Sequence, residues 1–463
     1  MYQSYEVSYP ATRQVWHDSR TAAGACLFYV ATRWSWILVR VVPFLSHRIF
    51  SLIIAASLTS IAISLHGTRV WVVACALVLV LIGASGGQDA WRRVTTPSLG
   101  LYRGPAIIRS DPERFHGGQR VTLELNGQRF ETLAYGSSGR RLSGRLMGEL
   151  VWVEGTRSGA RPDRIRWLAP RHVVGVLTLT SVSEQWSPGA PLYRSANRIR
   201  RVLIRSADVM PEQEASLFLG LIIGDDRNQS ETMRMAFRAA GLSHLVAVSG
   251  QNVAFVLIAL SPFLRRLRTW WRFVATLGVL GWFVVLTRIE PSVLRAAAMS
   301  TLAAFGFARG LRVSPRDILA CAVFGLLFLD PMLAWSIGFV MSVAATIGLI
   351  EITPRILRLF TKMRLPTWCG QPLAVTLGAQ LGVMPISIAV FHNAPVVGVV
   401  ANLLAVPVAG LVMLMGLPLG LVSAVLPEQL IVVVMAPMML AVRWVWWVAV
   451  LAQRVSPHGI WNI

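Results

Sequence analysis

Apolar and polar residues are distributed unevenly along this chain. Three apolar stretches come first, at about 27–45, 49–65 and 69–85. From about 91 to 185 the apolar runs shorten and alternate with polar residues. Long apolar runs then return at about 243–262, 270–288, 291–309, 316–329, 332–352, 372–390, 395–423 and 429–453. Runs of about 18 or more apolar residues are typical of transmembrane helices, so the pattern predicts a polytopic α-helical membrane protein.

The alternating segment predicts a small β-barrel inserted between the membrane segments. Asn126-Gly127 stands between two alternating runs, at 121–125 and 129–135, and is a strong signal for a two-residue β-hairpin. Further strands are predicted at 150–153, 163–168 and 172–179. Five short strands in a segment of this length are typical of the oligonucleotide-binding (OB-like) barrel.

The composition agrees with the membrane class. Hydrophobic residues make up 54% of the chain and charged residues 14%. A soluble globular domain carries about 25% charged residues. The four cysteines have no C-x-x-C spacing, so neither a disulfide framework nor a zinc site is indicated. The net charge of +22 suits an anionic partner, although cytoplasmic loops are basic in any membrane protein.

The predicted barrel carries much of this positive charge. Residues 92–171 contain fifteen arginines and seven acidic residues. Basic side chains that follow a phosphate backbone, and aromatic rings on which bases stack, are the device of single-strand binders. The residues that fit this role are Arg129, Tyr135, Trp152, Arg164, Arg166 and Trp167. The alternative is a basic barrel with a structural role only.

These patterns divide the chain into four segments and orient them. We expect transmembrane segments at 1–90, the barrel at 91–190, amphipathic connecting helices at 191–241 and a large membrane domain at 242–463. In the last segment, basic residues cluster after the first, third and fifth spans, and few follow the second, fourth and sixth. The positive-inside rule therefore makes the odd loops cytoplasmic and the barrel extracytoplasmic.

The membrane domain opens with a group of polar side chains. Its first residues are GLSHLVAVSGQNV at 241–253. Polar side chains in hydrocarbon are costly unless they face protein or water, so such a group is a functional-site hypothesis. On one helix, loosened at Ser249-Gly250, His244 and Gln251 nearly eclipse, and Ser249 lies three residues before Asn252. The alternative is a set of hydrogen bonds that only hold a helix bundle together.

Other polar residues fall on the same predicted outer side. Ser292 and Arg295 begin one span, Asn402 lies two turns into another, and Gln380 is near mid-membrane. The resulting set predicts an outer vestibule that narrows inward. Its members are His244, Ser249, Gln251, Asn252, Ser292, Arg295, Gln380 and Asn402.

Several separated motifs between about 215 and 425 carry a family resemblance. They are LIIGDDR at 221–227 with FRAAGLSHL at 237–245, AVSGQNV at 247–253, PSVLRAA at 291–297, DP at 330–331 with SIGF at 336–339, QLGVMP at 380–385 and ANLLAVP at 401–407. Together they resemble the ComEC family of competence proteins, the inner-membrane channels of natural transformation in bacteria. The order of membrane segments followed by a small barrel also fits that family.

The resemblance implies that residues 242–463 form a competence-type channel domain in the bacterial cytoplasmic membrane. Its substrate would be single-stranded DNA, which the eight polar residues would line on its way inward. Neutral polar groups suit a strand that must slide, because strong charges would hold it. The chain has no G-x-x-x-x-G-K-[ST] loop, so we expect a cytoplasmic ATPase or DNA-processing protein to supply the motive force.

Two departures from the family pattern limit what can be carried over. Gln251-Asn252 stands where many members have Leu-His, so no role of that histidine applies here. Many members also end in a metallo-β-lactamase-like domain, whereas the eight histidines of this chain form no H-x-H-x-D-H pattern. We therefore expect no metal, no cofactor and no catalytic residue, with strand degradation left to a separate nuclease.

Two further questions stay open at the level of sequence. Beyond DNA and membrane lipid, self-association into a homo-oligomer is neither predicted nor excluded. The alternative function is a secondary transporter for a small anionic solute. An inverted repeat with paired broken helices would favour a transporter, and no convincing internal repeat is found.

Overall fold

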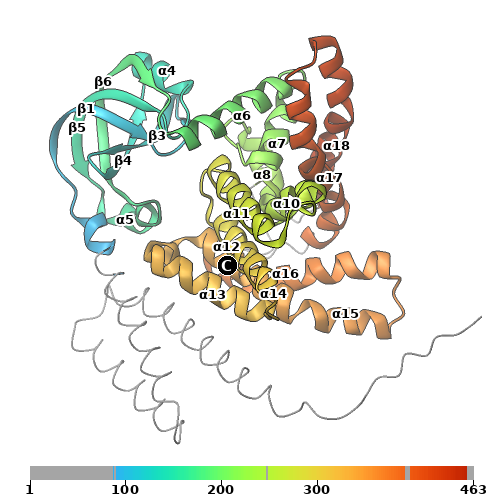
Figure 1. Cartoon of the computed structure of the whole chain (residues 1–463). Coiled ribbons are helices and arrows are strands. Elements are labelled where there is room, and N and C mark those ends of the chain that lie inside the picture. Colours follow the sequence, from blue (N-terminus) through green and yellow to red (C-terminus); the bar gives the residue numbers. More distant parts are fainter. Residues whose placement is uncertain (1–86, 88–89, 247–248, 392–396, 456–463) are drawn as a thin grey trace, which may run out of the picture. The chain divides into compact units, whose positions relative to one another are not determined.

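A computed structural model describes residues 87, 90–246, 249–391 and 397–455. The chain divides into two units, Met1–Ser85 and Gly86–Ile463, and the described residues all belong to the second. The three apolar stretches predicted at 27–45, 49–65 and 69–85 lie outside the described residues. Figure 1 shows that a short helical segment at 90–95 comes first along the described chain and is followed by a β-sheet segment and then by the other helices.

Six strands form one mixed sheet that closes into a ring. They are β1 (Gly100–Ile108), β2 (Glu113–Phe115), β3 (Gly118–Leu125), β4 (Gln128–Ala134), β5 (Leu150–Gly159) and β6 (Val173–Ser187). Their order is β1-β5-β6-β4-β3-β2, and a short pairing of β1 with β3 completes the ring. Only β4 and β6 are parallel neighbours in it. The predicted OB-like barrel is thereby confirmed, although its strands β1 and β2 were not among the predicted ones.

The strands form where apolar residues alternate with polar ones. Val121, Leu123 and Leu125 of β3 point into the barrel and are at most 1% exposed. The turn after β3 has positive φ at both central residues, 50° at Asn126 and 80° at Gly127. This is the requirement of a type I′ hairpin, so the Asn-Gly prediction is confirmed.

One predicted strand is wrong. Residues 163–168 belong to the helix α5 (Pro162–Leu168), which is followed by the 3-10 turn η2 (Ala169–Arg171). Pro162 suits the first helical turn because its φ is already fixed, and Asp163 lies at the positive end of the helix dipole. These start signals outweigh the strand-like alternation in so short a segment. The strand β6, 15 residues long, completes the barrel, and α4 (Gly136–Ser143) connects β4 to β5.

Three helices follow the barrel in the segment 191–241, and the second of them is buried on all sides rather than amphipathic. They are α6 (Pro191–Ala207), α7 (Glu212–Ile223) and α8 (Glu231–Ala239). α7 lies in the centre of the helical core, where Leu217, Phe218 and Leu221 are fully buried. It packs against the carboxy-terminal helices, so this connection is an integral part of the helical core.

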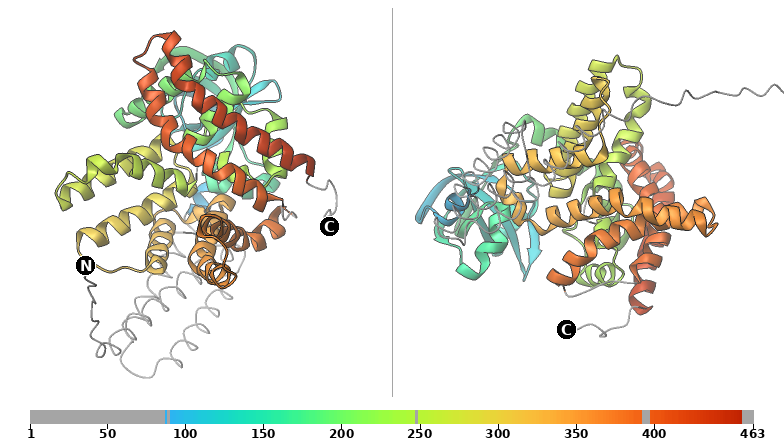
Figure 2. Two further views of the ribbon diagram at one scale, coloured as in Figure 1. Left: turned by 90° about the vertical axis from the view of Figure 1, so that its right-hand side faces the viewer. Right: turned by 90° about the horizontal axis from the view of Figure 1, so that it is seen from below.

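The remaining helices are mainly apolar. They are α9 (Ser243–Val246), α10 (Gly250–Leu264), α11 (Thr269–Leu286), α12 (Pro291–Ala308), α13 (Pro315–Leu329), η3 (Pro331–Trp335), α14 (Ile337–Glu351), α15 (Thr353–Lys362), α16 (Thr367–Phe391), α17 (Gly398–Ser423) and α18 (Glu428–Val455). The longest two, α17 and α18, lie side by side (Figure 2). Within the described residues, the helical runs long and apolar enough to cross a membrane are Thr269–Leu286, Ile337–Lys362, Cys369–Val390, Gly398–Ser423 and Glu428–Val455. The chain is therefore a multi-pass membrane protein.

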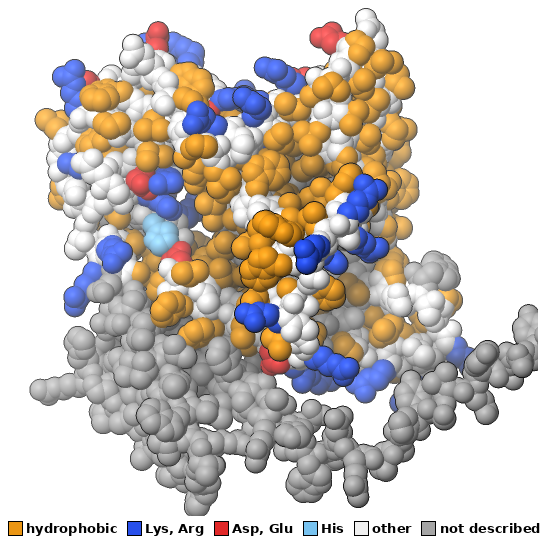
Figure 3. Space-filling view, viewed as in Figure 1, with side chains coloured by type: hydrophobic (Ala, Val, Ile, Leu, Met, Phe, Trp, Pro, Cys, Tyr) orange, Lys and Arg blue, Asp and Glu red, His pale blue; other side chains and the backbone are white. Residues whose placement is uncertain are grey.

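The surface of the helical part agrees with this class. Val433, Leu440 and Trp447 of α18 are each more than 60% exposed. Figure 3 shows hydrophobic side chains over much of the face of the helices turned to the viewer. A soluble protein rarely exposes apolar patches of this extent, whereas a membrane-spanning surface must do so.

Candidate functional site

The polar opening of the membrane domain contains a break between two helices. α9 and α10 are separate, and Ser249 between them is extended, with φ −108° and ψ 169°. Residues 247–248 lie outside the described residues. The expected alignment of His244 with Gln251 on one helix is therefore wrong, because no single helix carries both. The looser backbone predicted at this point is confirmed.

Ser249 and Asn252 hold the start of α10 in place. The Ser249 Oγ accepts a hydrogen bond from the Gln251 N–H at 3.2 Å, as an N-cap residue does, and donates to Asn252 Oδ1 at 3.3 Å. Asn252 is 3% exposed, and its Nδ2 donates to the Leu221 carbonyl at 2.9 Å. That carbonyl is in the last turn of α7, where C=O groups have no partner within the helix. The pair therefore joins α10 to α7.

Arg295 of α12 lies between α10 and α14. Its Nε donates to the Ser342 hydroxyl of α14 at 2.9 Å, and its Nη1 lies 3.3 Å from Met299 Sδ. A Cβ at Gly250 would lie 2.9 Å from Arg295 Nη2, so any larger residue there would displace the guanidinium. Among the described residues, no carboxylate forms an ion pair with Arg295, which is 8% exposed. Neutral groups therefore surround its positive charge.

Gln380 and Asn402 lie on adjacent helices, α16 and α17. A Cβ at Gly398, in the first turn of α17, would be 3.1 Å from Gln380 Nε2 and 3.3 Å from the Ala240 carbonyl oxygen. Asn402 follows Gly398 by one helical turn and is 5% exposed. Its Oδ1 is buried and accepts no hydrogen bond from the described residues. A buried amide oxygen without a donor is costly, which marks this atom as a candidate contact for water or for a bound group.

Five helices form a closed circuit of contacts, which we call the five-helix ring. α10 packs on α12, α12 on α14, α14 on α16, and α16 on α17, which returns to α10. Long polar side chains occupy three of the five junctions: Arg295 is at α10–α12 and α12–α14, and Gln380 is at α16–α17. The circuit thus connects the predicted path residues of four helices.

The other two junctions of the five-helix ring are tightly packed. At α14–α16, a Cβ on Gly348 would lie 2.1 Å from the Gly378 carbonyl oxygen, and a Cβ on Gly382 would lie 2.4 Å from the Ala344 carbonyl oxygen. At α10–α17, a Cβ on Gly410 would lie 3.0 Å from the Phe255 ring. Close approach through small residues is the usual way in which membrane helices associate.

The remaining predicted path residues lie at the ends of helices. His244 in α9 and Gln251 in the first turn of α10 are exposed, and Ser292 in the first turn of α12 is half-buried. Among the described residues, the eight predicted residues do not form a single cluster. Within the same residues, no group of three or more His, Cys, Asp or Glu side chains is arranged to hold a metal ion.

Acidic neighbours neutralise part of the charge that the sequence predicted on the barrel. Arg129 Nε lies 3.4 Å from Glu124 Oε2 on β3, and Arg164 Nη2 lies 2.8 Å from Glu131 Oε2 on β4. Arg166 is on α5, the same short helix as Arg164. Ion-paired arginines offer less charge to a phosphate, because binding must compete with the existing partner.

The three predicted stacking residues are exposed but lie on different elements. Tyr135 directly follows β4 and is 54% exposed, Trp152 on β5 is 49% exposed, and Trp167 on α5 is 65% exposed. Trp152 is in register with Pro105 of β1, and the strand β6 separates β5 from β4. The structure therefore places the candidate barrel residues around the barrel rather than on one strand.

A buried ionic network, which sequence reasoning missed, joins the barrel to the helices. Arg200 of α6 is 1% exposed, and its Nη2 lies 3.2 Å from Asp111 Oδ2 and 3.0 Å from Asp225 Oδ2. Its Nη1 donates to carbonyls at the carboxyl ends of α7 and α11. Arg288 Nε lies 2.8 Å from Asp111 Oδ2, and Arg227 Nη2 lies 2.6 Å from Asp225 Oδ2. We call these five residues the Arg200 network.

The arginines of the Arg200 network keep both carboxylates ionised. Burial by itself raises the pKa of Asp111, but Arg288 and Arg200 outweigh it and hold that pKa well below its ordinary value. The pKa of Asp225 is lowered in the same way, with burial opposed by Arg227 and Arg200. Each buried charge therefore has a partner of opposite sign, which is the condition for keeping ions in a low-dielectric interior.

Two further contacts connect the barrel to helix ends. Arg234 Nη2 of α8 lies 3.1 Å from Glu113 Oε1 of β2, and His172 Nε2 lies 2.8 Å from Asp330 Oδ2, directly after α13. Arg288 lies two residues after the end of α11. The loops after the second and fourth predicted spans thus contact the barrel, in agreement with the sequence assignment of these loops to the barrel side. That this side is extracytoplasmic stays a prediction from loop charges.

The sequence held only a partial signal for the Arg200 network. Asp225 and Arg227 are part of the LIIGDDR motif, where charges directly follow an apolar run. By contrast, nothing in the sequence singles out the other two residues. Asp111 is one of seven acidic residues in the barrel segment, and Arg200 is one of many arginines in the chain. Only the tertiary structure brings residues so far apart in sequence together.

An OB-like barrel followed by membrane helices with polar residues at their junctions defines the structural class of this protein. The family described as Competence protein matches residues 221–462, and the chain belongs to this family. The matched residues include all eight predicted path residues. The resemblance inferred from the motifs is thereby confirmed.

Two relatives show how far the similarity extends. ComE operon protein 3 of Bacillus subtilis (strain 168) is 27% identical over 247 residues, which cover 53% of this chain and 31% of that protein. Uncharacterized protein YcaI of Escherichia coli (strain K12) is 26% identical over 211 residues, which cover 42% of this chain and 27% of that protein. Each match thus covers less than a third of the relative. No solved structure matches the chain.

The Asn252 hydrogen bond predicts a difference between two adjacent substitutions. Asn252→Leu should destabilise the protein by about 1–3 kcal/mol, because the buried Leu221 carbonyl would lose its donor. Gln251→Leu, at an exposed position, should change stability by less than about 0.5 kcal/mol. Thermal unfolding of the purified protein in detergent measures both effects. Equal unfolding temperatures for the two variants would contradict the anchoring role of Asn252.

The Arg200 network predicts an acid-sensitive contribution to stability. Asp111→Asn should cost about 3–5 kcal/mol, because two buried arginines would share one carboxylate fewer. Since the folded pKa of Asp111 lies below its unfolded value of about 3.9, its contribution is complete above that pH and is lost as the pH falls towards the folded pKa.

Thermal unfolding between neutral pH and about pH 3 tests this sign. The wild type should lose more stability on acidification than Asp111→Asn. Glu184→Gln, which removes an exposed ion pair on the barrel, is the control and should behave as the wild type does. The same pH dependence in all three proteins would refute the role assigned to Asp111.

Proposed function

We propose that this protein conducts single-stranded DNA inward across the bacterial cytoplasmic membrane during natural transformation. The observation that carries the proposal is the five-helix ring, with long polar side chains at three of its junctions. Membership in the competence protein family supports a role in DNA uptake. The barrel supports it as well, because OB-like barrels are a common platform for single strands.

In this proposal the strand follows the inner face of the five-helix ring. Arg295 would attract the phosphates, because its charge is surrounded by neutral groups and by no described carboxylate. The side-chain amides of Gln380 and Asn402 would exchange hydrogen bonds with a hydrated strand without holding it by charge. The Asn402 Oδ1, which accepts no hydrogen bond from the described residues, fits a transient contact of this kind.

The barrel would meet the strand before the five-helix ring does. Tyr135, Trp152 and Trp167 are exposed, and base stacking on such rings tolerates any sequence. Because Arg129 and Arg164 are paired with glutamates, stacking would contribute more than charge on this part of the surface. The Arg200 network would keep the barrel next to the ends of the helices that the strand enters.

Motive force would come from a partner in the cytoplasm. The 463 residues contain no G-x-x-x-x-G-K-[ST] loop, so we assign the pulling step to a cytoplasmic ATPase or DNA-processing protein. In this proposal the chain is a conduit and not an enzyme, and degradation of the second strand belongs to a separate nuclease.

Deletion of the protein should abolish import of DNA while leaving DNA binding at the cell surface intact. The measurement follows labelled DNA into a pool of single strands inside the cytosol that resists added DNase. Expression of the wild-type chain should restore this pool. Labelled single strands that still reach the cytosol of the deletion strain would refute the conduit.

Arg295 should act through its charge. Arg295→Gln should lower DNA import by about tenfold or more, the lower end of what electrostatic focusing contributes. Arg295→Lys keeps the charge and should retain most of the import. Arg309→Gln, at the exposed far end of the same helix, is the control and should import normally. Equal loss in the Gln and Lys variants at normal protein levels would assign Arg295 a packing role instead.

A further inference from the structure

A pocket of about 200 Å³ lies between α10, α11 and α12. It is formed by the carboxyl halves of α10 and α12 and by the first two turns of α11. The Arg200 network adjoins the other end of α11, so the pocket and the network lie at opposite ends of this helix. Half of the lining is apolar, and the other half consists of four hydroxyl side chains and Arg272.

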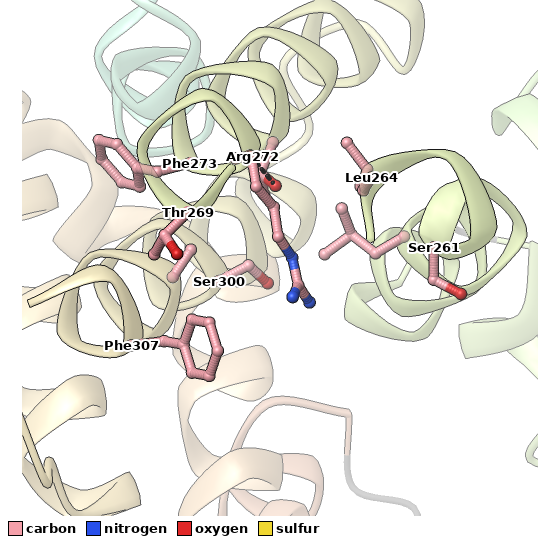
Figure 4. Close-up of a pocket in the computed structure, with 10 residues that line it drawn as sticks. Ser261, Leu264, Thr269, Arg272, Phe273, Ser300 and Phe307 are labelled. Carbon is pink, nitrogen blue, oxygen red and sulfur yellow. Dashed lines mark hydrogen bonds between the residues drawn. The ribbon is translucent and has the colours of Figure 1, made fainter. Parts of the chain in front are cut away.

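The Arg272 side chain supplies the only positive charge in the pocket lining. Figure 4 shows its guanidinium projecting between Ser300 and Phe307 on one side and Ser261 and Leu264 on the other. The guanidinium carbon lies 5.3 Å from the centre of the Phe307 ring. Among the described residues, no carboxylate forms an ion pair with Arg272. The pocket therefore combines an uncompensated cation with hydroxyl donors and an apolar wall.

The sequence around the pocket is basic and lacks acidic residues. Arg265, Arg266 and Arg268 directly precede α11, and Arg309 and Arg312 follow α12. From residue 232 to residue 316 the sole acidic residue is Glu290, which lies between α11 and α12 at the end away from the pocket. An anion that approaches this end of the three helices therefore meets no negatively charged side chain from α10, α11 or α12.

The pocket lies between two members of the five-helix ring, α10 and α12, and a helix that is not a member. That helix, α11, packs on both of them. Trp270 and Trp271, at the start of α11, are 56% and 63% exposed, and Phe307 is 66% exposed. Exposed tryptophans beside arginines are typical of the boundary between lipid headgroups and acyl chains.

We propose that this pocket binds the phosphate headgroup of an anionic phospholipid. Arg272 would donate charge-assisted hydrogen bonds to the phosphate, and the hydroxyls of Ser261, Thr269 and Ser300 would donate to its remaining oxygens or to the glycerol. The acyl chains would lie along the exposed apolar side chains of α10 and α12. Inorganic phosphate would leave the apolar half of the pocket unused.

Retention of lipid by the purified full-length protein tests this proposal. The protein in detergent is incubated with phosphatidylglycerol or with phosphatidylcholine, and bound lipid is counted by native mass spectrometry. The wild type should retain phosphatidylglycerol in preference to phosphatidylcholine. Arg272→Gln should retain about fivefold less phosphatidylglycerol, which corresponds to the loss of one basic contact. Arg266→Gln, an exposed arginine outside the pocket, is the matched control and should retain it normally.

A second variant separates the pocket from its charge. Ala304→Leu narrows the pocket and keeps every arginine, so it should also lower retention of phosphatidylglycerol. Unfolding temperatures show that the variants compared are folded. Equal retention by the Arg272 and Arg266 variants would overturn the proposal. Displacement of the lipid by inorganic phosphate, or by a single-stranded oligonucleotide, would overturn it as well and would assign the pocket to that ligand. None of these outcomes depends on what the five-helix ring conducts.

Discussion

The ion pairs of the buried Arg200 guanidinium hold the barrel and the helices of this protein together. One of its carboxylate partners, Asp111, belongs to the barrel, and the other, Asp225, follows the central helix α7. A buried arginine is stable only while its partners stay in place, so the barrel and the helices cannot separate without a large cost. The end of α7 also supplies the Leu221 carbonyl to Asn252. One helix end thus positions both the barrel and the start of the five-helix ring.

The polar residues of the membrane domain serve two different purposes. Ser249 and Asn252 satisfy each other and neighbouring backbone groups, which is the packing role that intramembrane polar residues often have. Two other residues have incomplete sets of partners among the described residues. Arg295 has no carboxylate beside its charge, and the Asn402 Oδ1 accepts no hydrogen bond. The packing interpretation therefore applies to Ser249 and Asn252 of the polar opening segment. The functional interpretation is strongest outside that segment, on α12 and α17.

Local patterns in the sequence predicted most of the helices and strands. The features that were not predicted depend mainly on tertiary contacts. The Asn126-Gly127 hairpin and the long apolar helices follow from turn chemistry and from hydropathy, which act over a few residues. The strand predicted at 163–168 was wrong, because its alternation is too short to outweigh Pro162 as a helix start. The break before α10 was visible only as Ser249-Gly250. The pairing of Arg200 with Asp111 could not be predicted, because nothing near either residue identifies its partner.

The glycine contact between α14 and α16 constrains how the five-helix ring can change its width. Where two backbones touch, no side chain can rotate to separate them, so these two helices can move apart only by displacement of their backbones. The junctions made by Arg295 and Gln380 consist of long side chains with several rotatable bonds. In the proposed channel, widening of the ring would therefore occur at those side chains rather than at the glycine contact. Arg295 and Gln380, whose side chains fill these junctions, are also residues that would contact the strand in the proposed channel.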